Sequence, residues 1–428
     1  MSSRPSICII GLGYVGLPLA IAVARDHRTL GFDIDQTRIR ELRDGHDRTN
    51  EVESDRLAAS NLIYSDQEAD IAGFDIYIIT VPTPVDEDNN PDLAYVLSAS
   101  DLVGRHMARG AIVVYESTVY PGVTEDICGP ALAAASGLVC GSDFHLGYSP
   151  ERINPGDREH TVDRITKVVA GQTPEITERL AGVYDAVTTG GVFLAANIRT
   201  AEAAKVIENA QRDINIAFVN EITMIFRRMG ISVHDVLEAS QTKWNFLPFT
   251  PGLVGGHCIG VDPHYLANAA IKAGVEPEVV LSGRRVNEGM GIFIAEQVAE
   301  QMERVFGDYA GRRVLVLGLT FKENVPDLRN TKVVDVISCL TAMECSVDVF
   351  DPRADQGETR SHYGIELMTE LPQQADYDCV VGLVPHAEIT ALKPSRLAGL
   401  LRDGGVVADI KAIWRGKEFP SGVTYWGL

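Results

Sequence analysis

The chain has 428 residues, of which 45% are hydrophobic and 23% are charged, so we expect an ordinary soluble protein of two or three domains. Its formal net charge of −21 argues against nucleic acid or an anionic membrane as a partner, because like charges repel. No apolar run approaches the roughly 20 residues of a membrane-spanning helix and no signal-peptide pattern is visible, so a cytoplasmic location is expected. The seven cysteines are scattered without a CxxC pair, which favours reduced thiols over a disulfide framework.

The first part of the chain alternates short apolar strands with helical segments, which predicts a parallel α/β sheet. Strands are expected at residues 7–10, 29–32, 76–81, 112–116 and 168–170. Apolar residues then recur at three- and four-residue spacing, which predicts long helices over 201–228 and 292–305. The βα rhythm returns with strands expected at 314–319, 345–350, 379–384 and 406–410.

This pattern predicts three parts: an α/β domain over residues 1–199, a helical centre over 200–310, and a second, smaller α/β domain over 311–428. The amphipathic helices of the centre would form a natural homodimer surface.

A glycine-rich turn, Gly11-Leu12-Gly13-Tyr14-Val15-Gly16, follows the first predicted strand and opens a helix over 17–25. The first glycine permits a tight turn, the second lets the backbone approach a pyrophosphate, and the third allows close packing of helix on strand. The carboxylate of Asp33, at the end of the next strand, can accept both ribose hydroxyls and would repel a 2′-phosphate, which favours NAD over NADP. Arg38 is expected to pack on the adenine or to soften that repulsion. A glycine turn without a ligand is the alternative.

Two further strand ends, at residues 80–84 and 116–119, should border the cofactor. Ligands of open α/β sheets bind beyond the carboxyl ends of the strands, where small hydroxyl residues can reach the nicotinamide ribose or hold a water. Ordinary loop chemistry is the alternative.

A cysteine between glycines is the most informative feature of the centre. The segment Gly255-Gly256-His257-Cys258-Ile259-Gly260-Val261-Asp262 removes steric bulk around the thiol. As a thiolate, Cys258 can attack an aldehyde to form a thiohemiacetal, and a second hydride transfer would give a thioester that water hydrolyses. One alternative is a buried structural thiol. Another is a zinc site of His257, Cys258, Asp262 and His264, although we expect no metal, because neighbouring His257 and Cys258 cannot easily point at one ion.

Polar residues interrupt the first long helix. Lys205, Asn209 and Arg212 are spaced at i, i+4 and i+7 on one face. An ammonium and an amide together can stabilise an alkoxide or a tetrahedral oxyanion, and Arg212 can bind a substrate oxygen or phosphate. A solvated helix face is the alternative. Glu151, in the turn-rich segment 148–156, can activate water for hydrolysis if its surroundings raise its pKa towards neutrality; alone, the segment indicates only a surface turn.

In this order, the motifs resemble the UDP-glucose/GDP-mannose dehydrogenase family over almost the whole chain. The features that carry the resemblance are GlyLeuGlyTyrValGlyLeuPro at 11–18, SerThrVal at 117–119, SerProGlu at 149–151, Lys205 with Asn209, Gly-Gly-His-Cys258 with Asp262, and Gly318-Leu319-Thr320-Phe321-Lys322. The resemblance implies two Rossmann-like α/β domains with parallel sheets, joined by a long central helix that forms a dimer. The N-terminal domain would bind NAD and the C-terminal domain the nucleotide of a UDP-sugar.

The resemblance also assigns roles to individual residues. Cys258 would be the nucleophile, Lys205 and Asn209 the oxyanion stabilisers, and Glu151 the hydrolytic base, while Asp262 and Thr118 would position water or take part in proton transfer. The residues implied to line NAD are Gly11, Gly13, Tyr14, Val15, Gly16, Asp33, Arg38, Thr83 and Thr118. Those implied to contact substrate are Arg152, Ile153, Lys205, Asn209, Arg212, Gly255, Phe321, Lys322 and Arg415.

Within the family, the sequence is more similar to the N-acetylhexosamine branch than to the UDP-glucose branch, on segments 149–156, 243–249, 255–266 and 321–332. It resembles bacterial UDP-N-acetylglucosamine or UDP-N-acetylgalactosamine 6-dehydrogenases of surface-polysaccharide pathways. His264 departs from the family pattern, which commonly has an aromatic residue there. We therefore predict a four-electron oxidation of C6 to the uronic acid. The alternatives are UDP-N-acetylmannosamine or UDP-glucose as the substrate, a single-step hydroxy-acid dehydrogenase, and a non-catalytic nucleotide-sugar sensor.

Overall fold

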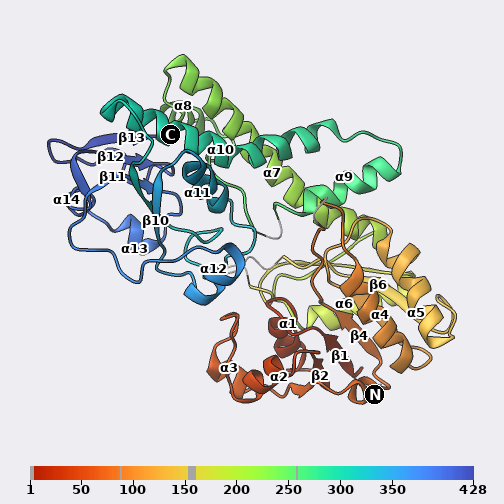
Figure 1. The fold of residues 1–428 in the computed structure, drawn as a ribbon. Coiled ribbons are helices and arrows are strands. Elements are labelled where there is room, and N and C mark those ends of the chain that lie inside the picture. The colour runs from red at the N-terminus through yellow and green to blue at the C-terminus, as the bar shows by residue number, and fades with distance from the viewer. Residues whose placement is uncertain (1–3, 87–88, 153–160, 257–258) are drawn as a thin grey trace. The chain divides into compact units, whose positions relative to one another are not determined.

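The protein is described by a computed structural model that covers residues 4–86, 89–152, 161–256 and 259–428. The chain divides into two compact units. The first unit comprises Met1–Glu208 and His264–Val275, and the second comprises Asn209–Pro263 and Glu276–Leu428. Each unit contains one β-sheet with helices packed against it (Figure 1).

The sheet of the first unit has eight strands in the order β3-β2-β1-β4-β5-β6-β7-β8. These strands are β1 (Ile7–Ile10), β2 (Thr29–Phe32), β3 (Ile63–Ser65), β4 (Ile76–Ile79), β5 (Ile112–Tyr115), β6 (His145–Tyr148), β7 (Lys167–Gly171) and β8 (Val192–Leu194). Strands β1, β2, β4, β5 and β7 were predicted, whereas β3, β6 and β8 were missed. The four central strands that were predicted, β1, β2, β4 and β5, are buried at every position, which is typical of a parallel sheet covered on both faces.

Among the strands that the structure describes, one neighbouring pair runs antiparallel. Strand β7 reverses against β6, with Gly147 opposite Gly171 and Tyr148 opposite Ala170. Each step forward along β6 is a step back along β7, so the same register continued past Tyr148 brings Glu151 opposite Lys167. This reversal places the start of β7 beside the carboxyl end of β6.

Helices cover both faces of this sheet. They are α1 (Gly16–Val23), α2 (Gln36–Arg43), α3 (Ser54–Ala58), α4 (Ala94–His106), α5 (Gly129–Ser136) and α6 (Pro174–Asp185), with a 3₁₀ turn at Glu68–Ile71 and a π-helical turn at Val123–Cys128. Side chains alternate along each strand, so Ile7 and Ile9 pack in one core layer while Cys8 and Ile10 pack in the other. Helices α1 and α6 contribute to the first layer, and α4 and α5 to the second.

The sheet of the second unit is fully parallel, in the order β10-β9-β11-β12-β13. Its strands are β9 (Arg313–Leu317), β10 (Ser346–Phe350), β11 (Tyr377–Gly382), β12 (Leu401–Asp409) and β13 (Thr424–Gly427). Helices α10 (Glu278–Phe306) and α11 (Val333–Ala342) supply one core layer, and α13 (Ala387–Thr390) and α14 (Pro394–Ala398) the other. The remaining helix of this sheet's chain segment is α12 (Gln356–Tyr363).

Helix α7 (Ile198–Met229) begins in the first unit and ends in the second. It contains the helix predicted over 201–228, and α10 contains the one predicted over 292–305. Two shorter helices, α8 (Val233–Gln241) and α9 (Asp262–Lys272), complete the centre of the chain. The predicted α/β fold, with parallel sheets in two Rossmann-like domains, is confirmed.

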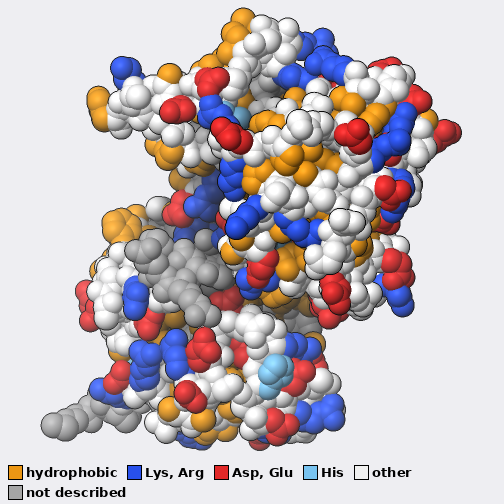
Figure 2. All heavy atoms as spheres, turned by 90° about the vertical axis from the view of Figure 1, so that its left-hand side faces the viewer, with side chains coloured by type: hydrophobic (Ala, Val, Ile, Leu, Met, Phe, Trp, Pro, Cys, Tyr) orange, Lys and Arg blue, Asp and Glu red, His pale blue; other side chains and the backbone are white. Residues whose placement is uncertain are grey.

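Two general properties accompany this fold. None of the helices within the described ranges combines the length and the apolar character that a bilayer crossing requires. Acidic and basic side chains are interspersed over the face drawn in Figure 2, with hydrophobic side chains among them.

Candidate active site

The glycine turn after β1 has the geometry that its sequence predicts. Gly11 adopts a φ of +96°, and a Cβ on Gly16 would lie 1.9 Å from the carbonyl oxygen of Gly11. The Thr80 hydroxyl donates to that same oxygen at 2.7 Å, which ties the end of β4 to the turn. Gly13 is exposed, with no atom within 4 Å of the place a Cβ would take. The first and third glycines are thus enclosed by protein, whereas the second faces open space.

Asp33 lies at the carboxyl end of β2 and holds this turn. One carboxylate oxygen accepts from the backbone N–H of Leu12 at 2.8 Å, and the other accepts from that of Asp35 at 2.9 Å. The turn, the N-terminus of α1 and this carboxylate fit a dinucleotide: the helix terminus would hold its phosphates and Asp33 its ribose. When it is bound, such a dinucleotide supplies a hydride acceptor.

Arg38 lies beneath the turn. The side chain is only 3% exposed, Nε donates to the carbonyl of Leu12 at 2.9 Å, and a guanidinium nitrogen lies 2.8 Å from Asp47. Burial raises the pKa of Asp47, but hydrogen bonds from Thr49 and Arg38 outweigh it and the pKa is lowered. Arg38 thus supports the turn from within the protein, and its contact with NAD stays a prediction.

The two other predicted strand ends are tied to each other and to helices of the same unit. The Ser117 hydroxyl donates to the carbonyl of Val81 at 2.7 Å, and the Tyr265 hydroxyl of α9 donates to that of Thr83 at 3.0 Å. Thr118 is half-buried. The buried carboxylate of Glu202, on α7, accepts from the backbone N–H groups of Gly122 and Thr124 at 2.6 and 2.9 Å. These bonds fix the backbone around Thr83 and Thr118.

Glu151 lies in a buried ion cluster rather than in an exposed turn. Its side chain is 5% exposed, and Nζ of the fully buried Lys167 donates to it at 3.0 Å. The same ammonium donates to Glu116 at 3.0 Å, and the Tyr184 hydroxyl donates to Glu116 at 2.5 Å. Burial raises the pKa of Glu151, but the charge and hydrogen bond of Lys167 outweigh it and the pKa is lowered. Glu151 itself is therefore not in an exposed turn, and the pKa raised towards neutrality that was expected of a hydrolytic base is not found; the lowered pKa keeps the carboxylate ionised and able to accept a proton.

The three polar residues of α7 differ in their surroundings. Lys205 and Asn209 are buried, at 7% and 6% exposure, whereas Arg212 is exposed. A solvated face is therefore wrong for the first two and fits Arg212. Arg152 lies against this helix in the first unit, where its guanidinium donates to the carbonyls of Ala204 and Lys205 and pairs with Glu208.

The second unit holds the segments that flank the predicted nucleophile. Ile153, His257 and Cys258 lie outside the described residues, so the zinc and structural-thiol alternatives stay untested. The segment before His257 and Cys258 is anchored at Gly252. Its N–H donates to the Asn220 side chain at 2.8 Å, and its C=O accepts from the same side chain at 3.0 Å. After them, the buried carboxylate of Asp262 accepts from the Asn209 amide at 2.5 Å. Asn209 is thereby oriented by one of the predicted acid residues.

The Gly255-Gly256 pair packs on the segment that carries Phe321 and Lys322. A Cβ on Gly255 would lie 2.7 Å from the carbonyl oxygen of Asn330, and one on Gly256, at a φ of +80°, would lie 2.8 Å from the Phe321 ring. The glycines are therefore required for close approach to residues 321–330. Two predicted substrate-contact segments meet here within one unit.

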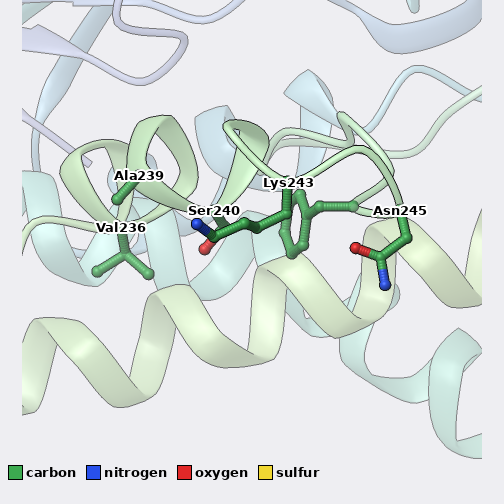
Figure 3. A pocket seen from close by; sticks show the side chains of 6 residues that line it. Val236, Ala239, Ser240, Lys243 and Asn245 are labelled. Carbon is green, nitrogen blue, oxygen red and sulfur yellow. The ribbon is translucent and has the colours of Figure 1, made fainter.

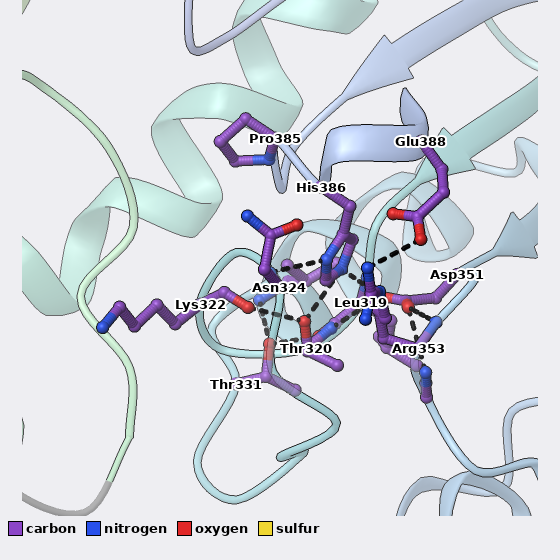
Figure 4. Close-up of polar contacts among 12 residues, drawn as sticks. Leu319, Thr320, Lys322, Asn324, Thr331, Asp351, Arg353, Pro385, His386 and Glu388 are labelled. Atoms are coloured by element: carbon purple, nitrogen blue, oxygen red, sulfur yellow. Dashed lines mark hydrogen bonds and ion pairs between the residues drawn. The ribbon is translucent and has the colours of Figure 1, made fainter. Parts of the chain in front are cut away.

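A buried polar cluster holds the start of that segment (Figure 4). Asp351, after β10, accepts from the backbone N–H groups of Leu319 and Thr320 at 2.5 and 3.0 Å and from His386 at 3.1 Å. Nδ1 of His386 accepts from the N–H of Asn324 at 2.9 Å, which assigns the ring proton to Nε2. Burial raises the pKa of Asp351, but His386 and the backbone donors outweigh it and hold the pKa at about 2.

The remaining predicted substrate residues lie in different settings. Figure 4 shows the Lys322 side chain extending away from the His386 cluster. Arg415 forms ion pairs with Asp235 and Glu238 of α8. A separate pocket of about 480 Å³ beside α8 is lined by Val236, Ala239, Ser240, Lys243, Asn245 and Phe246 (Figure 3). None of the predicted site residues lines that pocket.

Several residues that shape these segments escaped the sequence prediction. They are Lys167, Glu202, Asp351 and His386, all of which are buried. Lys167 and Glu202 resemble ordinary charged residues beside apolar runs. The partners of Lys167 follow from strand register and those of Glu202 from the packing of α7, and no local pattern shows either. Asp351 was detectable, because it follows a strand as Asp33 does.

Comparison with known proteins gives the family. Models of the UDP-glucose/GDP-mannose dehydrogenase family match in order: the NAD binding domain at residues 5–188, the central domain at 199–289 and the UDP binding domain at 315–416. The chain belongs to this family. It is an NAD-dependent nucleotide-sugar dehydrogenase, and the predicted NAD cofactor and UDP-sugar ligand are confirmed at this level.

The similar proteins span nearly the whole chain. Protein CapL of Staphylococcus aureus is 49% identical, covering 99% of both chains. UDP-N-acetyl-D-glucosamine 6-dehydrogenase of Pseudomonas aeruginosa is 48% identical over 95% of this chain and 96% of that protein. The solved structure of UDP-D-ManNAc dehydrogenase from Pyrococcus horikoshii has a TM-score of 0.88 at 28% identity, covering 99% of this chain and 98% of the other.

An added methyl group should have different effects at Gly16 and at Gly13. Gly16→Ala should destabilise the protein by at least about 1–3 kcal/mol, because its Cβ meets backbone. Gly13→Ala should fold normally but weaken NAD binding by at least about tenfold, because a methyl group would stand where the pyrophosphate approaches. Thermal unfolding and NAD titration separate the two. Gly182→Ala, at an open position of α6, is the control; normal NAD affinity in Gly13→Ala would contradict this assignment.

The Asp351 cluster predicts a selective defect. Asp351→Asn removes one acceptor from the backbone of residues 319–320 and should cost about 1–3 kcal/mol of stability. It should raise KM for the UDP-sugar without changing KM for NAD, because the altered segment lies in the UDP-binding domain. Steady-state kinetics with each substrate varied checks this. Asp376→Asn, which removes an exposed carboxylate from the same unit, should leave both constants unchanged.

Proposed function

We propose that the protein oxidises C6 of a UDP-N-acetylhexosamine, UDP-N-acetylglucosamine or UDP-N-acetylgalactosamine, to the uronic acid. The observation that carries the proposal is near full-length similarity to two UDP-N-acetyl-D-glucosamine 6-dehydrogenases, at 48% and 46% identity. Proteins named UDP-N-acetyl-D-mannosamine dehydrogenase and NDP-N-acetyl-D-galactosaminuronic acid dehydrogenase are 30% identical, so the similarity favours UDP-N-acetylglucosamine of the two substrates. The similarity to CapL supports a place in capsule or other surface-polysaccharide synthesis.

The oxidation proceeds through a thioester on Cys258. A first hydride leaves C6 for the acceptor that bound NAD would supply, and the C6 hydroxyl loses its proton, which leaves an aldehyde. The Cys258 thiolate then adds to the aldehyde carbon and the carbonyl oxygen becomes an oxyanion. The Lys205 ammonium and the Asn209 amide stabilise that oxyanion, with Asn209 oriented by Asp262. Loss of the second hydride gives the thioester.

Hydrolysis then releases the product. Glu151 takes a proton from water, the water oxygen bonds the thioester carbon, and the carbon–sulfur bond breaks with its electron pair going to sulfur. Thr118 positions water or passes a proton on the NAD-binding side. Arg152, Ile153, Arg212, Gly255, Phe321, Lys322 and Arg415 supply the contacts to the UDP-sugar.

A homodimer through α7 completes the proposal. Ile207, Phe218, Ile225 and Met229 of this helix are 48–62% exposed. Their spacing of eleven, seven and four residues keeps them near one face, as in a helix that packs against a partner.

The reaction stoichiometry tests the substrate and the double oxidation together. Incubation with a panel of UDP-sugars should give the highest kcat/KM with an N-acetylhexosamine, and two NADH should form for each sugar consumed. Absorbance of NADH and chromatography of the sugar nucleotide measure both quantities. One NADH and a free aldehyde would refute the thioester path, and a preference for UDP-glucose would refute the substrate assignment.

Removal of the thiol should stop uronic acid formation. Cys258→Ser should reduce its rate by about 10³-fold or more, because a serine hydroxyl is a far weaker nucleophile and cannot form a thioester. Uronic acid is quantified by chromatography under saturating NAD. Cys339→Ser, which alters a half-buried thiol on α11, should keep full activity. Undiminished turnover of Cys258→Ser would exclude the nucleophile assignment and leave the structural thiol.

A further inference from the structure

Three buried ionisable side chains meet where β5 and β6 end in the first unit. Glu116 follows β5 directly, Glu151 lies three residues past β6, and Lys167 is the first residue of β7. Lys167 and Glu116 are fully buried, and Glu151 is 5% exposed. The catalytic steps proposed above use Glu151 alone, so the other two groups need a separate explanation.

Every carboxylate oxygen of the cluster has a donor. Lys167 Nζ donates to Oε2 of Glu116 and to Oε2 of Glu151, at 3.0 Å each. The Tyr184 hydroxyl of α6 donates to Oε1 of Glu116, and the backbone N–H of Arg152 donates to Oε1 of Glu151, at 2.5 Å each. Glu151 is therefore held in one orientation by the sheet itself.

The three side chains carry charges of both signs. Two carboxylates share one ammonium, so these three groups together have a charge of −1 when both carboxylates are ionised. Burial raises the pKa of Glu116 to about 7 against the opposing effect of Lys167. The neighbouring guanidinium of Arg152 is engaged by the carbonyls of Ala204 and Lys205 and by Glu208.

We propose that Glu116 and Lys167 are positioning residues for the hydrolytic step, which hold the Glu151 carboxylate and set its affinity for the proton that it takes from water. This inference rests on the proposed role of Glu151 as the base. In that step the water proton moves to Glu151, the water oxygen bonds the thioester carbon, and the thiolate leaves. The cluster thereby passes from a net charge of −1 to zero.

The two positioning residues differ in how they act on Glu151. The positive charge and the hydrogen bond of Lys167 lower the pKa of Glu151, and a hydrogen bond from Glu116 lowers it further. Without Lys167, Glu151 would be protonated up to a higher pH and unable to act as a base there. Glu116, with a pKa of about 7, is itself protonated over the more acidic range in which Glu151 titrates, so a neutral amide in its place should leave the proton affinity of Glu151 nearly unchanged.

The pH dependence of kcat tests this assignment in the full-length enzyme. In Lys167→Met the acidic limb of the pH profile should move to higher pH by about one unit or more, and Lys167→Arg should restore it. In Glu116→Gln the limb should stay near its wild-type position while the plateau falls, because a neutral amide cannot pair with the Lys167 ammonium as a carboxylate does. Glu178→Gln, which removes an exposed carboxylate from α6, is the control and should not move the limb. A loss of packing alone would not shift the limb to higher pH in Lys167→Met and return it in Lys167→Arg.

Folding of each variant is checked by thermal unfolding. If Lys167→Met does not fold, the double variant Glu116→Gln with Lys167→Met takes its place, because the double variant loses one charge of each sign. Two NADH per sugar with an acidic limb that stays at the wild-type pH in Lys167→Met would overturn this inference and leave the proposed function intact. If the wild type formed one NADH per sugar, the proposed function would fail instead. The carbon-13 titration of Glu151, assigned against Glu151→Gln, would then decide the coupling, and an unshifted titration in Lys167→Met would overturn it.

Discussion

The buried ammonium of Lys167 joins the ends of three strands in the NAD-binding unit. Its two carboxylate partners come from segments that follow β5 and β6, and its own strand runs back beside β6. A lysine without these partners would be an unpaired buried charge, and removing one partner of a buried ion pair typically costs about 3–5 kcal/mol. The sheet edge and the proposed catalytic acid-base residue are thus stabilised by the same interaction.

Both units use one arrangement at the edge of the sheet. In the first, Gly11 has a φ of +96° and Asp33 accepts from the N–H of Leu12; in the second, Gly318 has a φ of +92° and Asp351 accepts from that of Leu319. Each aspartate follows the strand that neighbours the glycine's own. The same pairing of a glycine with an aspartate therefore shapes the turn in the NAD-binding domain and the turn in the UDP-binding domain. His386 takes part only in the second.

Much of the fold and of the candidate site was predictable from the sequence, because buried parallel strands and glycine turns have recognisable local sequence patterns. The motif at residues 11–16, Asp33, and the helices over 201–228 and 292–305 all lie in the predicted elements. The reversal of β7, the burial of Glu151 and the partners of Lys167 depend on register between distant segments, which no local pattern encodes. The bonds of Arg38 to Leu12 and Asp47 were not predicted either. The three-part division, the dimer, the location in the cell and the residue roles stay predictions.

Accumulation of the covalent intermediate tests the central claim most directly. In Glu151→Gln, oxidation should proceed to the thioester while hydrolysis is slowed, since the amide cannot take the proton from water. Intact-protein mass spectrometry after mixing with NAD and UDP-N-acetylglucosamine should then show an adduct of the substrate mass less four hydrogen atoms, mapped to Cys258 by peptide digestion. An enzyme that turns over without any adduct, or an adduct on another residue, would contradict the account.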